Sequence, residues 1–174
     1  LLKPFSLWQK KSFVFFKWAQ RLNGTIDHGV ISSQQSRKHV HAMRDVCDLL
    51  VIGGNTVRID RPTLDARLVN GKAPDVLIIS REDNFDRTIP LFSVKDRQVY
   101  IANDFTLMDK YKNIMIEGGS IMFELSKSYV DMYLSYIAPS LGGKEIMKSL
   151  DEKFKYINIQ ENQNDLVVWM EKEK

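Results

Sequence analysis

The sequence predicts an α/β domain with a mainly parallel central sheet, helices on both faces of that sheet and an antiparallel edge at its C-terminal end. Short apolar runs alternate with helical or polar stretches through most of the chain, which is the pattern of a parallel sheet covered on both faces. Two of these runs end in paired glycines, Gly53-Gly54 and Gly118-Gly119. The last two runs are joined by a short polar loop, which indicates a hairpin.

The N-terminal third contains a predicted buried strand, a helix and a second strand. Residues 13–19 are rich in aromatic and β-branched residues, and the turn residues 22–24 follow them. Ser33 can cap a helix that runs to about Asp45, and residues 49–53 form the next strand. Apolar residues recur at helical spacing on one side of that helix: Val40, Met43 and Cys47.

The rest of the chain is predicted to supply the remaining strands and one more capped helix. Four short apolar runs are predicted strands: residues 76–80, 98–102, 114–117 and 132–138. Ser120 stands where it can cap an amphipathic helix after the third of these runs. Residues 156–160 and 166–170 are two strands joined by the loop 161–165, and they form the predicted antiparallel edge.

The two glycine-edged strand ends favour a nucleotide phosphate site. Glycines let the backbone approach a ligand closely and let consecutive N–H groups point at an anion, while a following helix offers the positive end of its dipole. A single Gly-Gly pair after a strand is usually a plain turn. Two such turns along one edge of a parallel sheet lie where open sheets bind their ligands.

Composition excludes several classes of function. A chain of 174 residues with 44% hydrophobic content and no apolar run of membrane length is predicted to be one soluble domain. The net charge is only +3, and Lys and Arg are interspersed with Asp and Glu, so no nucleic-acid face is expected. The single cysteine, Cys47, excludes an internal disulfide and fits a reducing cytoplasm. His39 and His41 point to different helix faces, so no metal site is predicted.

Four ordered blocks of sequence resemble a known family: residues 17–24, 53–67, 117–119 and 130–143. They resemble the reductase domain of the bifunctional riboflavin-biosynthesis deaminase/reductase. The resemblance implies a fold like that of dihydrofolate reductase. It also implies the NADPH-dependent reduction of 5-amino-6-(5-phosphoribosylamino)uracil to 5-amino-6-(5-phosphoribitylamino)uracil.

The resemblance also implies a domain organisation and partners. No zinc-binding His/Cys deaminase motif occurs, so residues 12–174 are expected to be the reductase domain alone. Residues 1–11 are then a remnant of the linker to a deaminase domain that lies N-terminal to this chain. A homodimer is expected from the resemblance and from the apolar run 133–137.

The resemblance implies six catalytic or substrate-binding residues: Lys17, His28, Arg44, Leu64, Arg67 and Glu117. Lys17 would polarise the sugar or protonate its oxygen, and Glu117 would hydrogen-bond the aminouracil or move a proton. The two guanidiniums of Arg44 and Arg67 suit a ribose phosphate by charge and by fork geometry. The structural alternatives are an ion pair between Lys17 and Glu117 and solvated surface arginines.

For NADPH the resemblance implies a longer set of contacts: Ala19, Val30, Thr56, Asp60, Ser80, Arg81, Gly119, Ser120, Ile121, Met122, Phe123, Glu124 and Leu125. Ala19 would lie beside the nicotinamide, and Thr56 with the Gly119 amide suits a phosphate. Asp60 does not attract phosphate, so its role would be a hydrogen bond to ribose or to an amide. Ser80 or Arg81 could meet the adenosine 2′-phosphate and so favour NADP over NAD.

The sequence also departs from the family pattern. Asn23 and Arg61 each stand where the family has Asp, and the loop 25–30 is shorter, with His28 and Val30 in place of the usual Ser and Trp. Val30 cannot stack on a nicotinamide or hydrogen-bond it. Two alternatives to the pathway reductase therefore stay open: a dihydrofolate-type pterin reductase, and a degenerate NADPH-binding domain without turnover.

Overall fold

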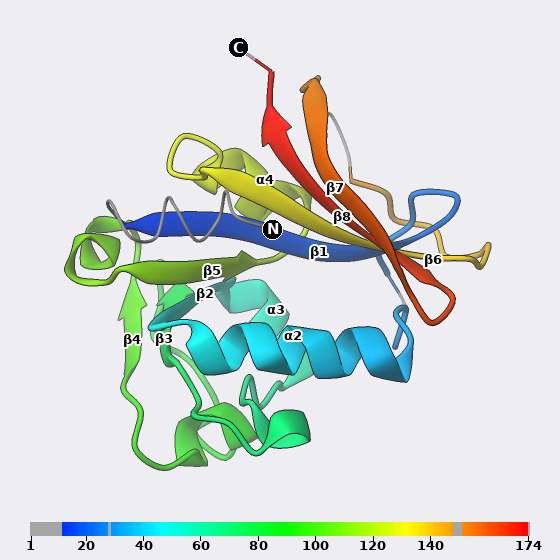
Figure 1. Ribbon diagram of the computed structural model, residues 1–174. Coiled ribbons are helices and arrows are strands. Elements are labelled where there is room, and N and C mark those ends of the chain that lie inside the picture. The colour runs from blue at the N-terminus through cyan, green and yellow to red at the C-terminus, as the bar shows by residue number, and fades with distance from the viewer. Residues whose placement is uncertain (1–11, 28, 148–150, 174) are drawn as a thin grey trace.

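The computed structural model describes residues 12–27, 29–147 and 151–173 (Figure 1). The strands of this part of the chain are β1 (Phe13–Arg21), β2 (Leu49–Gly53), β3 (Asp75–Ile79), β4 (Val99–Ala102), β5 (Asn113–Glu117), β6 (Met132–Ala138), β7 (Phe154–Asn162) and β8 (Asp165–Lys172). The α-helices are α2 (Gln34–Val46), α3 (Gly54–Asp60) and α4 (Ser120–Ser126), and the 3₁₀-helices are η1 (Arg67–Val69), η2 (Pro90–Ser93) and η3 (Thr106–Lys110).

The described strands form one sheet in the order β4-β3-β2-β5-β1-β6-β8-β7. All neighbouring pairs from β4 to β6 are parallel, and β8 pairs antiparallel with both β6 and β7. This arrangement confirms the predicted parallel sheet with an antiparallel C-terminal edge. The predicted five-residue hairpin loop is wrong, because β7 and β8 continue their pairing to Asn162 and Asp165 and leave only residues 163–164 to make the turn.

Helices cover both faces of the sheet, as predicted. Side chains alternate along β1, so Phe13 and Phe15 pack in the cluster beneath α2 and α3, whereas Val14 and Phe16 pack in the cluster beneath α4 and η3. Figure 1 shows α2 and α4 on opposite sides of β1. The face that carries α2 is the one that holds the candidate site.

Helix α2 begins as the sequence predicts. The Ser33 hydroxyl accepts a hydrogen bond from the Ser36 N–H at 3.2 Å, which is the expected N-cap. The Asp165 carboxylate accepts a hydrogen bond from the Ser33 N–H at 2.7 Å, so the start of the helix is also tied to β8. Val40 is buried against the sheet, while residues 34, 35, 37 and 38 are exposed.

The predicted cap of α4 is wrong. The N-cap residue is Gly119, which keeps an extended backbone, and Ser120 is already the first helical residue. A Cβ at Gly119 would lie 3.0 Å from Cδ1 of Ile26, and the glycine makes no side-chain cap hydrogen bond. The Ser120 hydroxyl points instead toward the Ile146 carbonyl at 3.5 Å.

The apolar run 133–137 belongs to the core. It lies in β6, which is paired on one side with β1 and on the other with β8, and Tyr133 and Tyr136 are fully buried. Core packing therefore accounts for the apolar character of this run, which does not support a dimer interface. Among the described helices, none has the length and apolar content needed to cross a membrane.

Candidate active site

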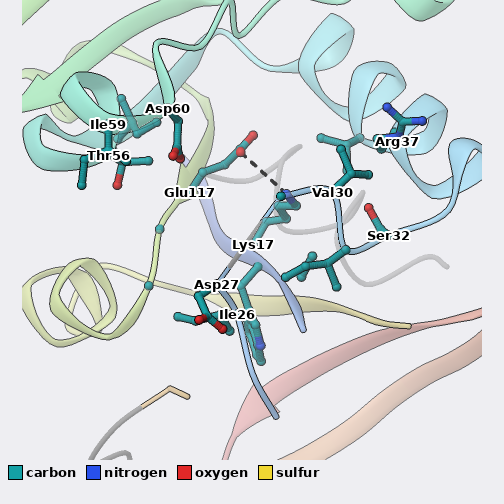
Figure 2. A pocket seen from close by; sticks show the side chains of 18 of the residues that line it. Lys17, Ile26, Asp27, Val30, Ser32, Arg37, Thr56, Ile59, Asp60 and Glu117 are labelled. Carbon is teal, nitrogen blue, oxygen red and sulfur yellow. Dashed lines mark ion pairs between the residues drawn. The ribbon is translucent and has the colours of Figure 1, made fainter. Parts of the chain in front are cut away.

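A pocket of about 780 Å³ opens toward the carboxyl ends of β2, β5 and β1, on the face covered by α2 (Figure 2). Its floor contains Lys17 and Ala19 from β1, Ile52 from β2 and Glu117 from β5. Lys17 and Ala19 lie on this face because they continue the alternation of Phe13 and Phe15. The volume is in the range of small-molecule sites, which are roughly 300–1,000 Å³.

Three charged side chains form a network on the pocket floor. Lys17 and Glu117 are register partners on the parallel strands β1 and β5, and the Lys17 Nζ lies 3.7 Å from the Glu117 Oε2. Arg44 reaches down from α2 and donates to Glu117 Oε1 from Nε at 3.2 Å and from Nη2 at 3.0 Å. The ion pair between Lys17 and Glu117, which was the structural alternative to catalytic roles, is thus present, with Arg44 as a further partner of the same carboxylate.

The network shifts the pKa of two of its members. Burial opposes ionisation of Glu117, but the charges of Arg44 and Lys17 outweigh burial and lower the pKa of Glu117 to about 2. Burial also lowers the pKa of Lys17, with Arg44 acting in the same direction and Glu117 against it. The site therefore contains a firmly ionised carboxylate beside an ammonium that releases its proton more easily than an ordinary lysine.

Hydrogen bonds connect α2 to residues 65–68 beside the charged network. Arg44 Nη1 donates to the Asp65 carbonyl at 3.3 Å, and Arg67 Nη1 pairs with the Asp65 carboxylate at 2.6 Å. His41 Nδ1 accepts from the Leu68 N–H at 3.4 Å, and burial lowers the pKa of His41. Burial thus favours the neutral form of the ring, while the Asp65 carboxylate, 3.8 Å from Nδ1, opposes this shift.

Leu64 does not line the pocket, although the resemblance implies a substrate contact there. Its side chain is buried in the core, and its backbone has φ +56°. Its carbonyl accepts a hydrogen bond from Nη1 of the buried Arg97 at 2.8 Å, and Arg97 Nη2 also donates to the carbonyls of Thr63 and Leu91. Arg97 thus anchors the start of the loop that carries Asp65 and Arg67.

The residues predicted for NADPH divide into two groups. The pocket lining includes Ala19, Val30, Thr56, Asp60 and Gly119. The other predicted residues are not part of the lining: Ser80, Arg81, Ser120, Ile121, Met122, Phe123, Glu124 and Leu125. His28 and the proposed linker 1–11 lie outside the described residues.

The predicted NADPH residues that do not line the pocket lie in the core or on the surface, or are hydrogen-bonded elsewhere. Met122 and Phe123 are buried in the core beneath α4, whereas Ile121 is 76% exposed. The Ser80 hydroxyl accepts from Arg58 Nη2 at 3.1 Å and donates to the Glu82 carbonyl at 2.8 Å. The second glycine turn therefore meets the pocket through Gly118 and Gly119 and not through the whole run to residue 125.

Sequence reasoning missed many of the lining residues: Trp18, Ile26, Asp27, Gly29, Ile31, Ser32, Arg37, Val40, His41, Ile52, Asn55, Ile59, Leu68 and Glu145. Helical spacing could have found Arg37 and His41, because they precede Arg44 by seven and three positions on one helix face. No spacing pattern in the sequence indicates Glu145, which lies in the connection between β6 and β7. Within the described ranges, no group of three or more His, Cys, Asp or Glu could hold a metal ion.

Comparisons with known proteins agree with this architecture. The sequence pattern of the RibD C-terminal domain family matches residues 13–168. The riboflavin biosynthesis protein RibD of Aquifex aeolicus is 23% identical over 84% of this chain and 53% of its own length. The solved deaminase/5-amino-6-(5-phosphoribosylamino)uracil reductase of Thermotoga maritima superposes with a TM-score of 0.76 at 22% identity, over 94% of this chain and 57% of that one.

Dihydrofolate reductase of Enterococcus faecalis, solved with NADP(H), superposes with a TM-score of 0.60 at 12% identity, over 93% of this chain and 97% of that one. The predicted dihydrofolate-reductase-like fold is confirmed. The chain spans about half the length of the Aquifex and Thermotoga proteins. Because the family pattern covers nearly all of the described residues, the chain belongs to the RibD C-terminal domain family.

Proposed function

We propose that this chain reduces 5-amino-6-(5-phosphoribosylamino)uracil to 5-amino-6-(5-phosphoribitylamino)uracil, using NADPH. The observation that carries the proposal is the buried Lys17–Glu117–Arg44 network on the floor of a pocket at the carboxyl edge of the sheet. Membership of the RibD C-terminal domain family supports the same reaction.

The residues of the pocket floor fit a nicotinamide cofactor. Ala19, Gly118 and Gly119 present small side chains or none where the pocket meets the ends of β1 and β5. Ile26 adds apolar surface, and Thr56 adds a hydroxyl. A flat ring with a polar edge suits such a surface. When bound, NADPH supplies the hydride that reduces C1′ of the substrate.

Lys17 is the proposed proton donor. As the C1′–O4′ bond of the ribose breaks, the Lys17 ammonium protonates O4′, and the nitrogen attached to C1′ takes up the resulting cationic charge as an iminium. Hydride addition to C1′ then neutralises that charge, so the substrate gains one hydride and one proton overall. The lowered pKa of Lys17 makes this transfer easier.

Glu117 and Arg44 are proposed to position the reacting groups. The Glu117 carboxylate holds the Lys17 ammonium at 3.7 Å, and it also suits hydrogen bonding to the N–H groups of an aminouracil. Arg44 keeps the carboxylate ionised and oriented through two donors. Asp60, the last residue of α3, lines the same pocket and remains a candidate partner for a ribose hydroxyl or an amide.

The first test is NADPH oxidation by the purified chain, followed by absorbance. We expect turnover with 5-amino-6-(5-phosphoribosylamino)uracil and none with dihydrofolate, and we expect the Lys17→Met variant to bind NADPH without turning over. Turnover with dihydrofolate alone would establish a pterin reductase instead. NADPH binding without turnover on either compound would indicate a degenerate binding domain or a fragment that needs its missing partner.

We also propose that the chain is the reductase part of a longer protein, because its relatives extend well beyond it. Residues 12–174 would form the reductase domain, and residues 1–11 would be part of the linker from a deaminase domain. A homodimer is a further prediction, which light scattering of the purified chain would test.

A further inference from the structure

Lys17 lies between two side chains that come from the neighbouring strands. Strand β1 is flanked by β5 on one side and by β6 on the other (Figure 1). Glu117 of β5 lies 3.7 Å from the Lys17 Nζ, and the centre of the Tyr136 ring of β6 lies 5.8 Å from the same atom. The ammonium therefore has a carboxylate on one side and the face of an aromatic ring on the other.

Helix α2 fixes the position of the Tyr136 ring. The side chain of Tyr136 is fully buried, its hydroxyl is hydrogen-bonded with Nδ1 of His39 at 3.0 Å, and the two rings meet edge to face. The same helix carries Arg44, which is ion-paired with Glu117 at 3.0 Å. Helix α2 thus holds both neighbours of Lys17, through His39 on one side and through Arg44 on the other.

Tyr136 contacts Lys17 through its ring and not through a negative charge. Burial and the nearby Glu117 carboxylate raise the pKa of Tyr136, with Arg44 acting against them, so the phenol stays neutral. The face of an aromatic ring attracts a cation that lies within about 6 Å of its centre, and more strongly where water is excluded. Because burial opposes the charged form of Lys17, this attraction offsets part of the cost of keeping the ammonium in the pocket floor.

Tyr136 does not line the pocket, so any effect that it has on substrate or cofactor passes through Lys17. We infer that Tyr136 is a positioning residue for Lys17, and that the face of its buried ring stabilises the ammonium on the side of β1 opposite Glu117. The consequence of this role for catalysis rests on the proposed function, in which Lys17 is the proton donor.

The test replaces Tyr136 with phenylalanine and with phenylalanines that carry an increasing number of ring fluorines. These rings are similar in size, but each fluorine withdraws electrons from the ring face and weakens its attraction for a cation. The pKa of Lys17 is measured in the chain without ligands, by NMR of isotope-labelled lysine side chains, and the Lys17→Met variant assigns the signal. The control is the same series at Tyr133, which is also buried on β6 but packs in the cluster beneath α4.

We expect the pKa of Lys17 to fall with each fluorine at position 136, by about 0.5–1 pH unit over the whole series. Tyr136→Phe without fluorine should keep nearly the wild-type value because it keeps the ring, and the series at Tyr133 should leave the value unchanged. The other charged groups that face Lys17 are Glu117 and Arg44, and they are the same in every variant, as is the loss of the hydrogen bond to His39. A constant pKa along the series at position 136, or an equal fall along the series at position 133, would overturn the inference.

The same variants connect this role to the proposed reaction. A proton donor with a lower pKa loses its proton at lower pH, so the alkaline limb of kcat/KM for the aminouracil should move to lower pH in the same steps. Failure of the proposed function would be recognised separately. If the wild-type chain does not turn over the aminouracil, the proposed reaction is wrong, and the titration of Lys17 in the ligand-free chain still decides whether Tyr136 stabilises the ammonium.

Discussion

Replacing Glu117 with glutamine should lower the free energy of unfolding by about 3 kcal/mol near pH 7. The carboxylate is held by two cations in a site where its own side chain is only 13% exposed. Their attraction lowers its pKa from 4.5 to about 2. At about 1.4 kcal/mol per pH unit, this difference corresponds to roughly 3 kcal/mol of stabilisation of the ionised form. Breaking a buried ion pair by removing one partner typically costs a similar amount, about 3–5 kcal/mol.

The effect should also depend on pH with a definite sign. Because the pKa of Glu117 is depressed in the folded protein, its stabilising contribution is complete above the unfolded value of 4.5 and is lost as the pH falls toward about 2. The difference between wild type and Glu117→Gln should therefore be largest near neutral pH and should shrink in this acidic window. Urea unfolding, measured from about pH 7 down to about pH 3, gives both quantities.

Glu124→Gln is the control. Glu124 pairs with Lys127 on the surface, where the two side chains are 43% and 37% exposed, so its loss should cost less than about 1 kcal/mol. A loss below about 1 kcal/mol for Glu117→Gln, or a loss that persists unchanged at acidic pH, would refute the reasoning. Either result would mean that Lys17 and Arg44 do not hold Glu117 as an anion.

Three further predictions concern positions outside this network. Arg97→Met should lower the free energy of unfolding by about 3 kcal/mol in urea, because it strands three carbonyls that Arg97 now satisfies. Gly118→Ala should cost roughly 1–3 kcal/mol by the same measurement, since a Cβ there would lie 2.5 Å from the Met122 Cβ, and an unchanged free energy of unfolding would show that the junction can widen. Burial raises the pKa of the Cys47 thiol, so a thiol reagent should label Cys47 in urea and not in the native protein, and rapid native labelling would contradict its burial.

Much of the fold follows from local patterns in the sequence. The strands from β1 to β6 are short apolar runs, and α2 has a capping serine and apolar residues at helical spacing, so each element is recognisable by itself. The two wrong predictions, the α4 cap and the length of the β7–β8 loop, concern the ends of elements and not the elements themselves. Helix α4 begins with Ser120 as its first helical residue, so Gly119 is its N-cap, and the β7–β8 turn shortens because pairing continues to Asn162.

The candidate site was partly predictable for the same reason. Lys17 and Glu117 each lie near the carboxyl end of a predicted strand, so a meeting at the sheet edge could be expected. The bond from Arg44 to Glu117 joins residues 73 positions apart and depends on how α2 crosses the sheet. The anchoring of Leu64 by Arg97 depends in the same way on a contact between two loops.

The order of residues along the chain was sufficient to indicate the fold class, the glycine-edged strand ends and the family, because all of these are properties of short segments. Only the tertiary structure determines which arginine of the pocket is already paired with a carboxylate. Arg37, Arg44 and Arg67 are similar side chains in sequence, and their charges differ in availability because the folded chain places Glu117 against Arg44 and Asp65 against Arg67 while leaving Arg37 without a described partner. The strength of an ion pair depends on the distance between its charges and on their burial, and the packing of the folded chain determines both.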